Sequence, residues 1–197
     1  MITLYHKPKT RSDRFVFLLE ELGVPYEIHP VSLQTADGTS KADPANPHPH
    51  GKVPAISDDG VTVFESSAIA LYLTDKFPKA GLGPVVGDAK RGAYVTWLAY
   101  YGGVLEPAFI SKFINLEVPR PMAGWVSVDD ATGYVIQTLS AGPYLLGDTF
   151  SAADILYGTT FAMFGQSPLM PKSPVVDGYV QRVVERPAYA RAAAKAA

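Results

Sequence analysis

The sequence predicts an α+β domain followed by an all-α domain. Two observations support this fold class. Strand-like and helix-like segments alternate over about the first eighty residues, and the periodic segments that follow have helical spacing. Between them lies PKAGLGPVVGD, a stretch rich in glycine and proline that is typical of a linker. We therefore predict a first domain over residues 1–77, a linker over 78–87 and an all-helical domain over 88–197.

The first domain begins with a strand, a turn and a helix. Residues 2–5 form a short β-prone run, and the polar, proline-containing turn HKPKTRSD follows it. Apolar side chains then recur at i, i+3, i+4 and i+7, which is the spacing of an amphipathic helix. Ser12 or Asp13 is available to cap its start, and Gly23 marks its end.

Three more strands and a helix complete this domain. Alternation in PYEIHPV predicts a second strand, and the strand, helix, strand order favours a parallel pair. The β-prone runs VPAIS and VTVF flank Asp58-Asp59-Gly60, which predicts an antiparallel hairpin. A helix is expected from about Ser66.

The second half carries helix signals only. The helix from Arg91 should kink at Gly102-Gly103 and Pro107. A further helix is expected around Val128 to Val135. Another should start at Ser151, where Asp154 completes a capping box, and one or two helices should close the chain.

Composition excludes several kinds of function. Seventeen basic and nineteen acidic side chains give a net charge of -2, so we expect neither a nucleic acid nor a membrane as partner. The chain contains no cysteine, which excludes disulfides, thiolate metal sites and a cysteine nucleophile, and suits a reducing compartment. The N-terminus shows no signal-peptide pattern. We therefore expect a cytoplasmic protein.

Two features suggest a binding site. Pro54 interrupts the strand-like run KVPAI, although proline cannot donate a hydrogen bond to a sheet. Ser66 begins a helix, so its hydroxyl and the free N–H groups there can hold a carboxylate, while Glu65 can pair with an ammonium group. Together these two residues suit the head group of an α-amino acid.

At this point the sequence resembles the cytosolic glutathione S-transferase superfamily, in its bacterial-type, serine- or threonine-like form rather than the cysteine type. Four segments carry the resemblance: LYHKPKTRSDRFVFLLEELGVPYE, NPHPHGKVPAISDDG, FESSAIALYL and GPYLLGDTFSAADILY. The resemblance covers nearly the whole chain. It implies a thioredoxin-like first domain, a helical second domain and glutathione as co-substrate.

The resemblance also assigns a role to the proline. In this family the peptide bond before the matching proline is cis, and the backbone of the residue matching Val53 pairs with the cysteinyl unit of glutathione. Glu65 and Ser66 match the pair that holds the γ-glutamyl end. Lys52 and His50 either reach the glycyl carboxylate or remain in solvent.

The catalytic group is expected in the turn after the first strand, where the family places a tyrosine, serine or cysteine. Thr10 falls at the serine-type position, Arg11 at the cysteine-type position, and the tyrosine-type position lies near His6. Ser12 is a second hydroxyl candidate, although capping a helix would also explain it. Thr10, Ser12 and Arg11 therefore all stay candidates for stabilising the glutathione thiolate.

A small hydrophobic electrophile is the expected second substrate, and the helical domain should contact it. Four aromatic side chains are candidates for its pocket, although aromatics at such spacing also form cores: Tyr100, Tyr101, Phe109 and Phe113. His48 and His50 lack a third ligand nearby, so we expect no metal there.

Three functions are compatible with these features. The first is conjugation of glutathione to hydrophobic electrophiles. The second is another glutathione-dependent reaction, such as peroxide reduction, dehalogenation or isomerisation; the absence of cysteine disfavours disulfide reduction. The third is a non-catalytic glutathione-binding module. The family further implies a homodimer.

Overall fold

A computed structural model describes residues 1–165 and 167–196 of the chain. It divides into two compact units. The first unit contains Met1–Ala80 together with the segment from Pro187 onward, and the second unit contains Gly81–Arg186. The chain thus passes from the first unit to the second within the stretch that we predicted as a linker.

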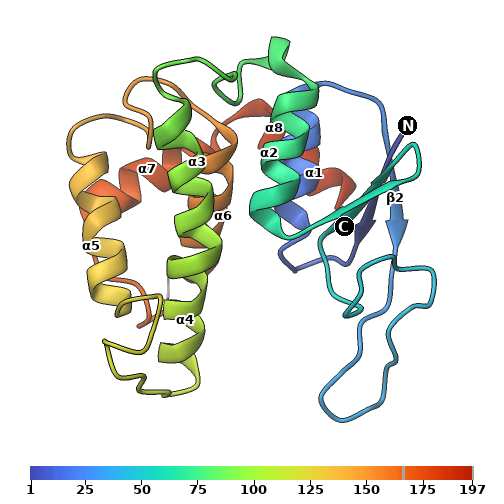
Figure 1. The fold of residues 1–197 in the computed structure, drawn as a ribbon, viewed down its shortest axis with the longest axis horizontal. Coiled ribbons are helices and arrows are strands. Elements are labelled where there is room, and N and C mark those ends of the chain that lie inside the picture. The colour runs from blue at the N-terminus through green and yellow to red at the C-terminus, as the bar shows by residue number, and fades with distance from the viewer. Residues whose placement is uncertain (166, 197) are drawn as a thin grey trace. The chain divides into compact units, whose positions relative to one another are not determined.

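A four-stranded mixed sheet forms the centre of the first unit, in the order β2-β1-β3-β4 (Figure 1). Strand β1 (Ile2–His6) pairs in parallel with β2 (Tyr26–Pro30) and antiparallel with β3 (Ala55–Asp58). Strand β4 (Val61–Phe64) completes the predicted hairpin with β3. Asp59 and Gly60 form its two-residue turn, and both have positive φ, as a turn that matches the twist of the strands requires.

Helices of the first unit begin and end close to the predicted residues. Helix α1 (Asp13–Leu22) buries its apolar face and ends at Gly23, whose φ of 65° is readily adopted only by glycine. Helix α2 (Ser66–Lys76) starts at the predicted serine. A single 3-10 turn (Pro78–Ala80) follows α2.

The last helix differs from our expectation. We placed residues up to 197 in the helical domain, whereas α8 (Pro187–Lys195) belongs to the first unit and lies beside α1. Arg191 and Lys195 both pair with Glu20 of α1, and Tyr189 packs edge-on against Phe17 at 5.3 Å between ring centroids. Figure 1 shows the two helices together. Periodicity predicts the helix but not the surface against which it packs.

The second unit is entirely helical over its described residues, apart from isolated bridges within residues 144–149. Helix α3 (Arg91–Tyr100) continues through a π-helical turn (Tyr101–Leu105) into α4 (Glu106–Phe113). This irregular turn contains the Gly102-Gly103 pair at which the sequence predicted a kink. The remaining helices are α5 (Val128–Leu139), α6 (Ala152–Phe164) and α7 (Pro174–Val184).

Asp154 organises the core around α6. The predicted capping box is present, because the side chain of Asp154 accepts from the backbone N–H and hydroxyl of Ser151. The backbone N–H of Leu145 and the hydroxyl of Tyr179 also donate to this carboxyl group, at 2.9 and 3.0 Å. Its complete burial raises the pKa of Asp154 to about 6 despite these donors.

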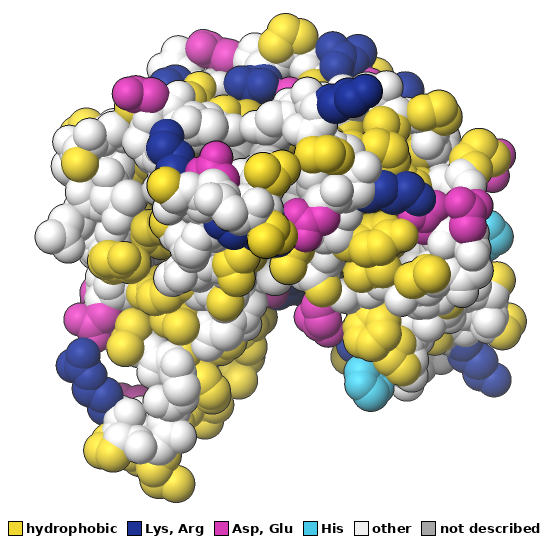
Figure 2. Space-filling model, turned by 45° about the horizontal axis from the view of Figure 1, so that its top comes forward, with side chains coloured by type: hydrophobic (Ala, Val, Ile, Leu, Met, Phe, Trp, Pro, Cys, Tyr) yellow, Lys and Arg dark blue, Asp and Glu magenta, His cyan; other side chains and the backbone are white. Residues whose placement is uncertain are grey.

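Charged side chains of both signs are interspersed on the face drawn in Figure 2, and neither sign forms a continuous patch there. This distribution agrees with the small net charge of -2. Among the residues that the structure describes, no helix has the length and hydrophobicity that crossing a membrane requires.

Replacing Asp154 tests the importance of this cap. Asp154→Ala leaves the N–H groups of Leu145 and Ser151 buried without their acceptor, and the hydroxyl of Tyr179 keeps only its longer contact of 3.3 Å with the backbone carbonyl of residue 154. We expect the free energy of unfolding to fall by about 2–4 kcal/mol, measured by urea denaturation at pH 7. Asp177→Ala removes an exposed acid from the first turn of α7 and is the matched control. Equal stability of the two variants would contradict the stabilising role of Asp154 at the start of α6.

Candidate functional site

Strand register brings the predicted glutathione residues to one end of the sheet. Tyr5 of β1 is paired with Ala55 of β3, and Ala55 is paired with Phe64 of β4. One residue further along each strand, His6, Pro54 and Glu65 therefore occupy the same end of three neighbouring strands. The turn after β1, the segment before β3 and the start of α2 all leave the sheet at this edge.

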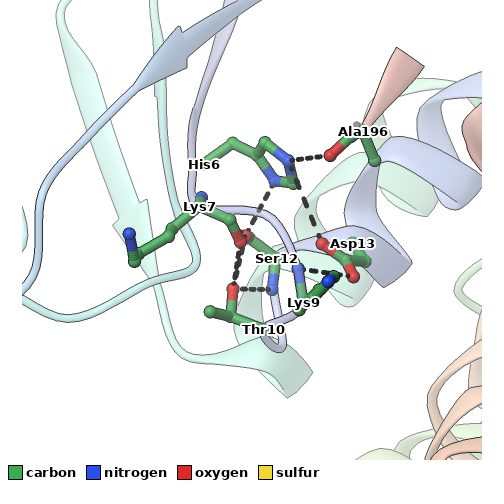
Figure 3. Close-up of polar contacts among 7 residues, drawn as sticks. All are labelled: His6, Lys7, Lys9, Thr10, Ser12, Asp13 and Ala196. Atoms are coloured by element: carbon green, nitrogen blue, oxygen red, sulfur yellow. Dashed lines mark hydrogen bonds and ion pairs between the residues drawn. The ribbon is translucent and has the colours of Figure 1, made fainter. Parts of the chain in front are cut away.

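The turn after β1 is held by hydrogen bonds within residues 6–13, shown in Figure 3. The N–H of Asp13 donates to the carbonyl of Thr10 at 3.1 Å, and the N–H of Lys9 donates to Asp13 Oδ2 at 3.1 Å. Lys9 has a φ of 62°, which turns the chain back toward the start of α1. The turn is therefore held by hydrogen bonds between its own residues.

Two hydroxyl groups meet inside this turn. Thr10 Oγ1 lies 2.6 Å from the carbonyl of Lys7, to which it donates, and 2.8 Å from Ser12 Oγ. Ser12 Oγ lies 2.8 Å from His6 Nδ1 and accepts from the N–H of Lys7 at 3.1 Å. Figure 3 shows the three side chains joined in one network.

Burial separates the two hydroxyl candidates. Ser12 has no exposed surface, so its hydroxyl cannot reach a thiol, and we correct its assignment as a thiolate donor. It also makes no cap to α1, contrary to the simpler explanation, because its oxygen is directed to Lys7 and His6. Thr10 remains partly exposed, and the neighbouring Arg11 is exposed. Of the two hydroxyl groups, only that of Thr10 can touch a ligand.

His6 lies beneath the turn and is only 3% exposed. Its Nε2 atom is 3.2 Å from the carbonyl oxygen of Ala196 and 3.9 Å from Asp13 Oδ1. Burial raises the pKa of the Asp13 carboxyl above its ordinary value, and the His6 ring opposes this shift. Among the described residues, Asp13 Oδ1 is buried without a hydrogen-bond partner.

Hydrogen bonds within residues 46–52 hold the segment before β3. Asn46 Nδ2 donates to the carbonyl of Lys52 at 2.9 Å, and the N–H of His50 donates to His48 Nδ1 at 3.1 Å. The His48 ring packs against Phe64 with centroids 5.0 Å apart, and burial lowers the pKa of His48. The predicted binding residues His50 and Lys52 are exposed to solvent.

The Val53–Pro54 peptide bond is cis, as the resemblance predicted. Pro54 is buried and Val53 is partly exposed, one residue before the ladder of β3 begins. Within the described parts of the chain, no hydrogen bond to the backbone N–H or carbonyl of Val53 is found. A peptide lying along this edge could therefore pair with Val53.

Glu65 and Ser66 differ in exposure to solvent. Glu65 is exposed, whereas Ser66 is 7% exposed and opens α2, whose first N–H groups have no partner within the helix. Glu65 has φ 71° and ψ 129°, a conformation that side chains other than glycine rarely adopt. This strained backbone turns the chain from β4 into α2.

The four aromatic candidates for the electrophile pocket have different surroundings. Tyr101 is completely buried, and its hydroxyl forms hydrogen bonds with Glu106 and Thr160. Phe109 is buried and stacked on Phe164. We therefore correct both assignments, because Tyr101 and Phe109 are core residues of the second unit. Tyr100 is partly exposed beside Tyr134, and Phe113 is 69% exposed. These two stay predictions.

A cavity of about 510 Å³ lies elsewhere on α4, between that helix, the following loop and the start of α5. Two salt bridges flank it, Lys112 with Asp129 and Arg120 with Asp130. None of the four predicted aromatics lines it. Within residues 1–165 and 167–196 we find no group of three or more side chains placed to hold a metal ion.

The sequence did not assign the roles of three residues in the site. His6 forms a hydrogen bond with Ser12 in the turn after β1. Asn46 and His48 form hydrogen bonds that hold the segment before β3. An asparagine before a proline favours turns, which was a signal for Asn46. A histidine at the end of a strand carries no comparable signal.

Comparisons with known proteins agree with this arrangement. A family model described as glutathione S-transferase, N-terminal domain, matches residues 11–76. Glutathione S-transferase 4 of Zea mays is 31% identical over 196 residues, which cover 89% of this chain and 84% of the relative. The chain belongs to the glutathione S-transferase family.

A solved structure and a second relative add information on the fold and on the named activities of similar proteins. The structure of a sphingomonad glutathione S-transferase complexed with glutathione has a TM-score of 0.77 and 28% identity, and the match covers 98% of each chain. The disulfide-bond oxidoreductase YfcG of Escherichia coli is 29% identical, over 100% of this chain and 96% of the relative. The fold is therefore that of glutathione S-transferases.

The backbone at Glu65 predicts an effect on stability. Glu65→Gly removes the clash that positive φ imposes on a side chain, so we expect the free energy of unfolding to rise by up to about 1 kcal/mol. Glu65→Ala keeps the Cβ atom and should give no gain. Urea denaturation of both variants measures the difference, and a less stable glycine variant would show that the backbone is unstrained.

Proposed function

We propose that this protein binds glutathione at the edge formed by Val53, Glu65 and Ser66 and stabilises its thiolate with the hydroxyl of Thr10. The thiolate then attacks a small hydrophobic electrophile. The observation that carries the proposal is the strand register, which brings the turn after β1, the segment before β3 and the N-terminus of α2 to one end of the sheet.

Each part of the tripeptide has a partner of suitable chemistry. The cysteinyl unit pairs with the backbone of Val53, as a peptide that extends a sheet does. The γ-glutamyl carboxylate binds Ser66 and the first N–H groups of α2, and its ammonium group pairs with Glu65. Lys52 and His50 are exposed near the glycyl end and contribute positive charge or hydrogen-bond donors there.

Stabilising the thiolate requires a modest free energy. Lowering a thiol pKa from about 8.5 to about 6.5 takes about 2.7 kcal/mol. A hydrogen bond to a charged group contributes about 1.5–3 kcal/mol, so one donor at Thr10 supplies much of the requirement. The exposed cations of the turn, Lys7, Lys9 and Arg11, add favourable charge around it.

A second candidate is a different glutathione-dependent reaction on the same site. The relative YfcG carries the name of a disulfide-bond oxidoreductase. Because this chain has no cysteine, any disulfide exchange would have to proceed between glutathione and the substrate. Peroxide reduction, dehalogenation, isomerisation and glutathione binding without catalysis are further alternatives. Product analysis with each substrate class separates them.

The remaining parts of the proposal concern the second substrate and the assembly. We expect the helical unit to contact the electrophile, with Tyr100 and Phe113 as the accessible aromatics. The protein should act as a homodimer, as the family resemblance implies, and in the cytoplasm, as its composition and N-terminal sequence suggest. Turnover of aryl halides, epoxides, enals and hydroperoxides with glutathione tests the reaction, and no turnover with any of them would refute the catalytic part.

Thr10 is the residue that decides the mechanism. Thr10→Val removes the hydroxyl and should lower kcat about a hundredfold, while calorimetry should give a similar affinity for glutathione. Thr10→Ser restores the hydroxyl and should recover most of the rate.

Thr62→Val is the matched control, since Thr62 is exposed on β4 and lies outside the turn. Undiminished turnover in Thr10→Val would exclude Thr10 as the thiolate donor and would favour Arg11 or a backbone N–H of the turn.

A further inference from the structure

A continuous path of hydrogen-bonding groups leads from the surface of the turn to a buried histidine. Thr10 Oγ1 and Ser12 Oγ are 2.8 Å apart, and Ser12 Oγ and His6 Nδ1 are also 2.8 Å apart. In the first pair either oxygen can be the donor. The path begins at the partly exposed Thr10 and ends at a ring that is 3% exposed (Figure 3).

The carbonyl of Ala196 sets the tautomer of this ring. A carbonyl only accepts hydrogen bonds, so the contact of 3.2 Å requires the proton of neutral His6 to lie on Nε2. Nδ1 is then an acceptor for the hydroxyl of Ser12. Ser12 Oγ in turn has two lone pairs. One accepts from the N–H of Lys7, and the other can accept the hydroxyl proton of Thr10 when that hydroxyl turns from the Lys7 carbonyl, to which it donates at 2.6 Å.

The surroundings also accommodate a protonated ring. Imidazolium would donate from Nδ1 to Ser12 Oγ and from Nε2 to Ala196, so neither partner has to be replaced. Asp13 Oδ1, buried without a hydrogen-bond partner among the described residues, lies 3.9 Å from Nε2 and offers a negative charge. The imidazolium form of His6 would therefore have a hydrogen-bond partner for each ring nitrogen and a carboxylate nearby.

We infer that His6 accepts the proton of the glutathione thiol through Ser12 and Thr10. This inference rests on the proposed function. The S–H proton passes to Thr10 Oγ1, the proton of Thr10 passes to Ser12 Oγ, and the proton of Ser12 passes to His6 Nδ1. Glutathione becomes a thiolate, His6 becomes an imidazolium, and both hydroxyl groups end with one proton each. The hydroxyl of Thr10 then turns from the carbonyl of Lys7 and donates to the thiolate.

The proton returns by the same path after the chemical step. When the thiolate adds to an activated double bond, the new carbanion or enolate takes one proton, and His6 can supply it back through Ser12 and Thr10. When the thiolate displaces a halide, the halide leaves as an anion and His6 loses its proton to solvent. In both cases His6 ends neutral.

Few other charged groups lie near the ring within residues 1–165 and 167–196. Helix α1 contributes Asp13, 3.9 Å from Nε2, and next to it in the chain the buried Arg14, whose charge acts on Asp13. The neighbouring strands place prolines beside His6, since Pro30 is its partner on β2 and Pro54 lies opposite on the β3 side. The C-terminal segment contributes the Ala196 carbonyl, and its nearby Lys195 is paired with Glu20. Among the described residues, Asp13 is therefore the acid closest to the imidazolium.

His6→Asn tests the relay, because the asparagine carbonyl can accept from Ser12 but cannot hold the proton. The readout is the ultraviolet absorbance of the bound thiolate, titrated with pH. We expect the midpoint to rise by about one unit, which is a roughly tenfold smaller thiolate fraction at low pH. Affinity for S-methylglutathione, which has no thiol proton, should stay within about twofold by calorimetry.

His29→Asn is the matched control, a histidine of the same sheet on β2 that takes no part in the network. Its midpoint should equal that of the wild type. An unchanged midpoint in His6→Asn overturns the relay. If that variant does not fold, Ser12→Ala decides, because it removes the middle of the path and leaves Thr10 and His6; it too should raise the midpoint.

The wild type separates failure of the relay from failure of the proposed function. If the wild-type protein binds no glutathione, both are wrong. If it binds glutathione and forms thiolate while both variants keep the wild-type midpoint, only the relay is wrong.

Discussion

The register of β1, β3 and β4 is the constraint on which the candidate site depends. Pairing of Tyr5 with Ala55 and of Ala55 with Phe64 brings three chain segments to one sheet edge. A shift of one residue would turn the buried side chains Leu4 and Ile56 out of the core, so hydrophobic burial fixes the register. Because the register is fixed by the core, the site needs no bound ligand to bring its parts together.

Differences in burial give the two hydroxyl groups of the turn different roles. The hydroxyls of Ser12 and Thr10 are neighbours, but Ser12 is buried and its bonds are directed inward, whereas Thr10 keeps an exposed side. A buried hydroxyl must keep its partners, since leaving them unpaired is costly. Ser12 is therefore suited to connecting Thr10 with His6, and the closing helix α8 completes the network by bringing Ala196 to the ring.

The sequence predicted features with local causes and missed those that depend on distant residues. Gly23, the Asp59-Gly60 turn and the Ser151–Asp154 capping box act within a few residues, and each appears where expected. The bond between His6 and Ala196 joins residues 190 positions apart, which no local pattern reveals. The π-helical turn after Tyr100 shifts the faces of the helix, so the spacing of Tyr101 and Phe109 did not show that both are buried.

A crystal structure with bound glutathione tests the central claim most directly. The account predicts a cysteinyl unit hydrogen-bonded to the backbone of Val53, a γ-glutamyl end at Glu65 and Ser66, and a sulfur atom within about 3.5 Å of Thr10 Oγ1. A tripeptide bound away from Val53, or a sulfur atom directed to a group other than Thr10, would contradict it.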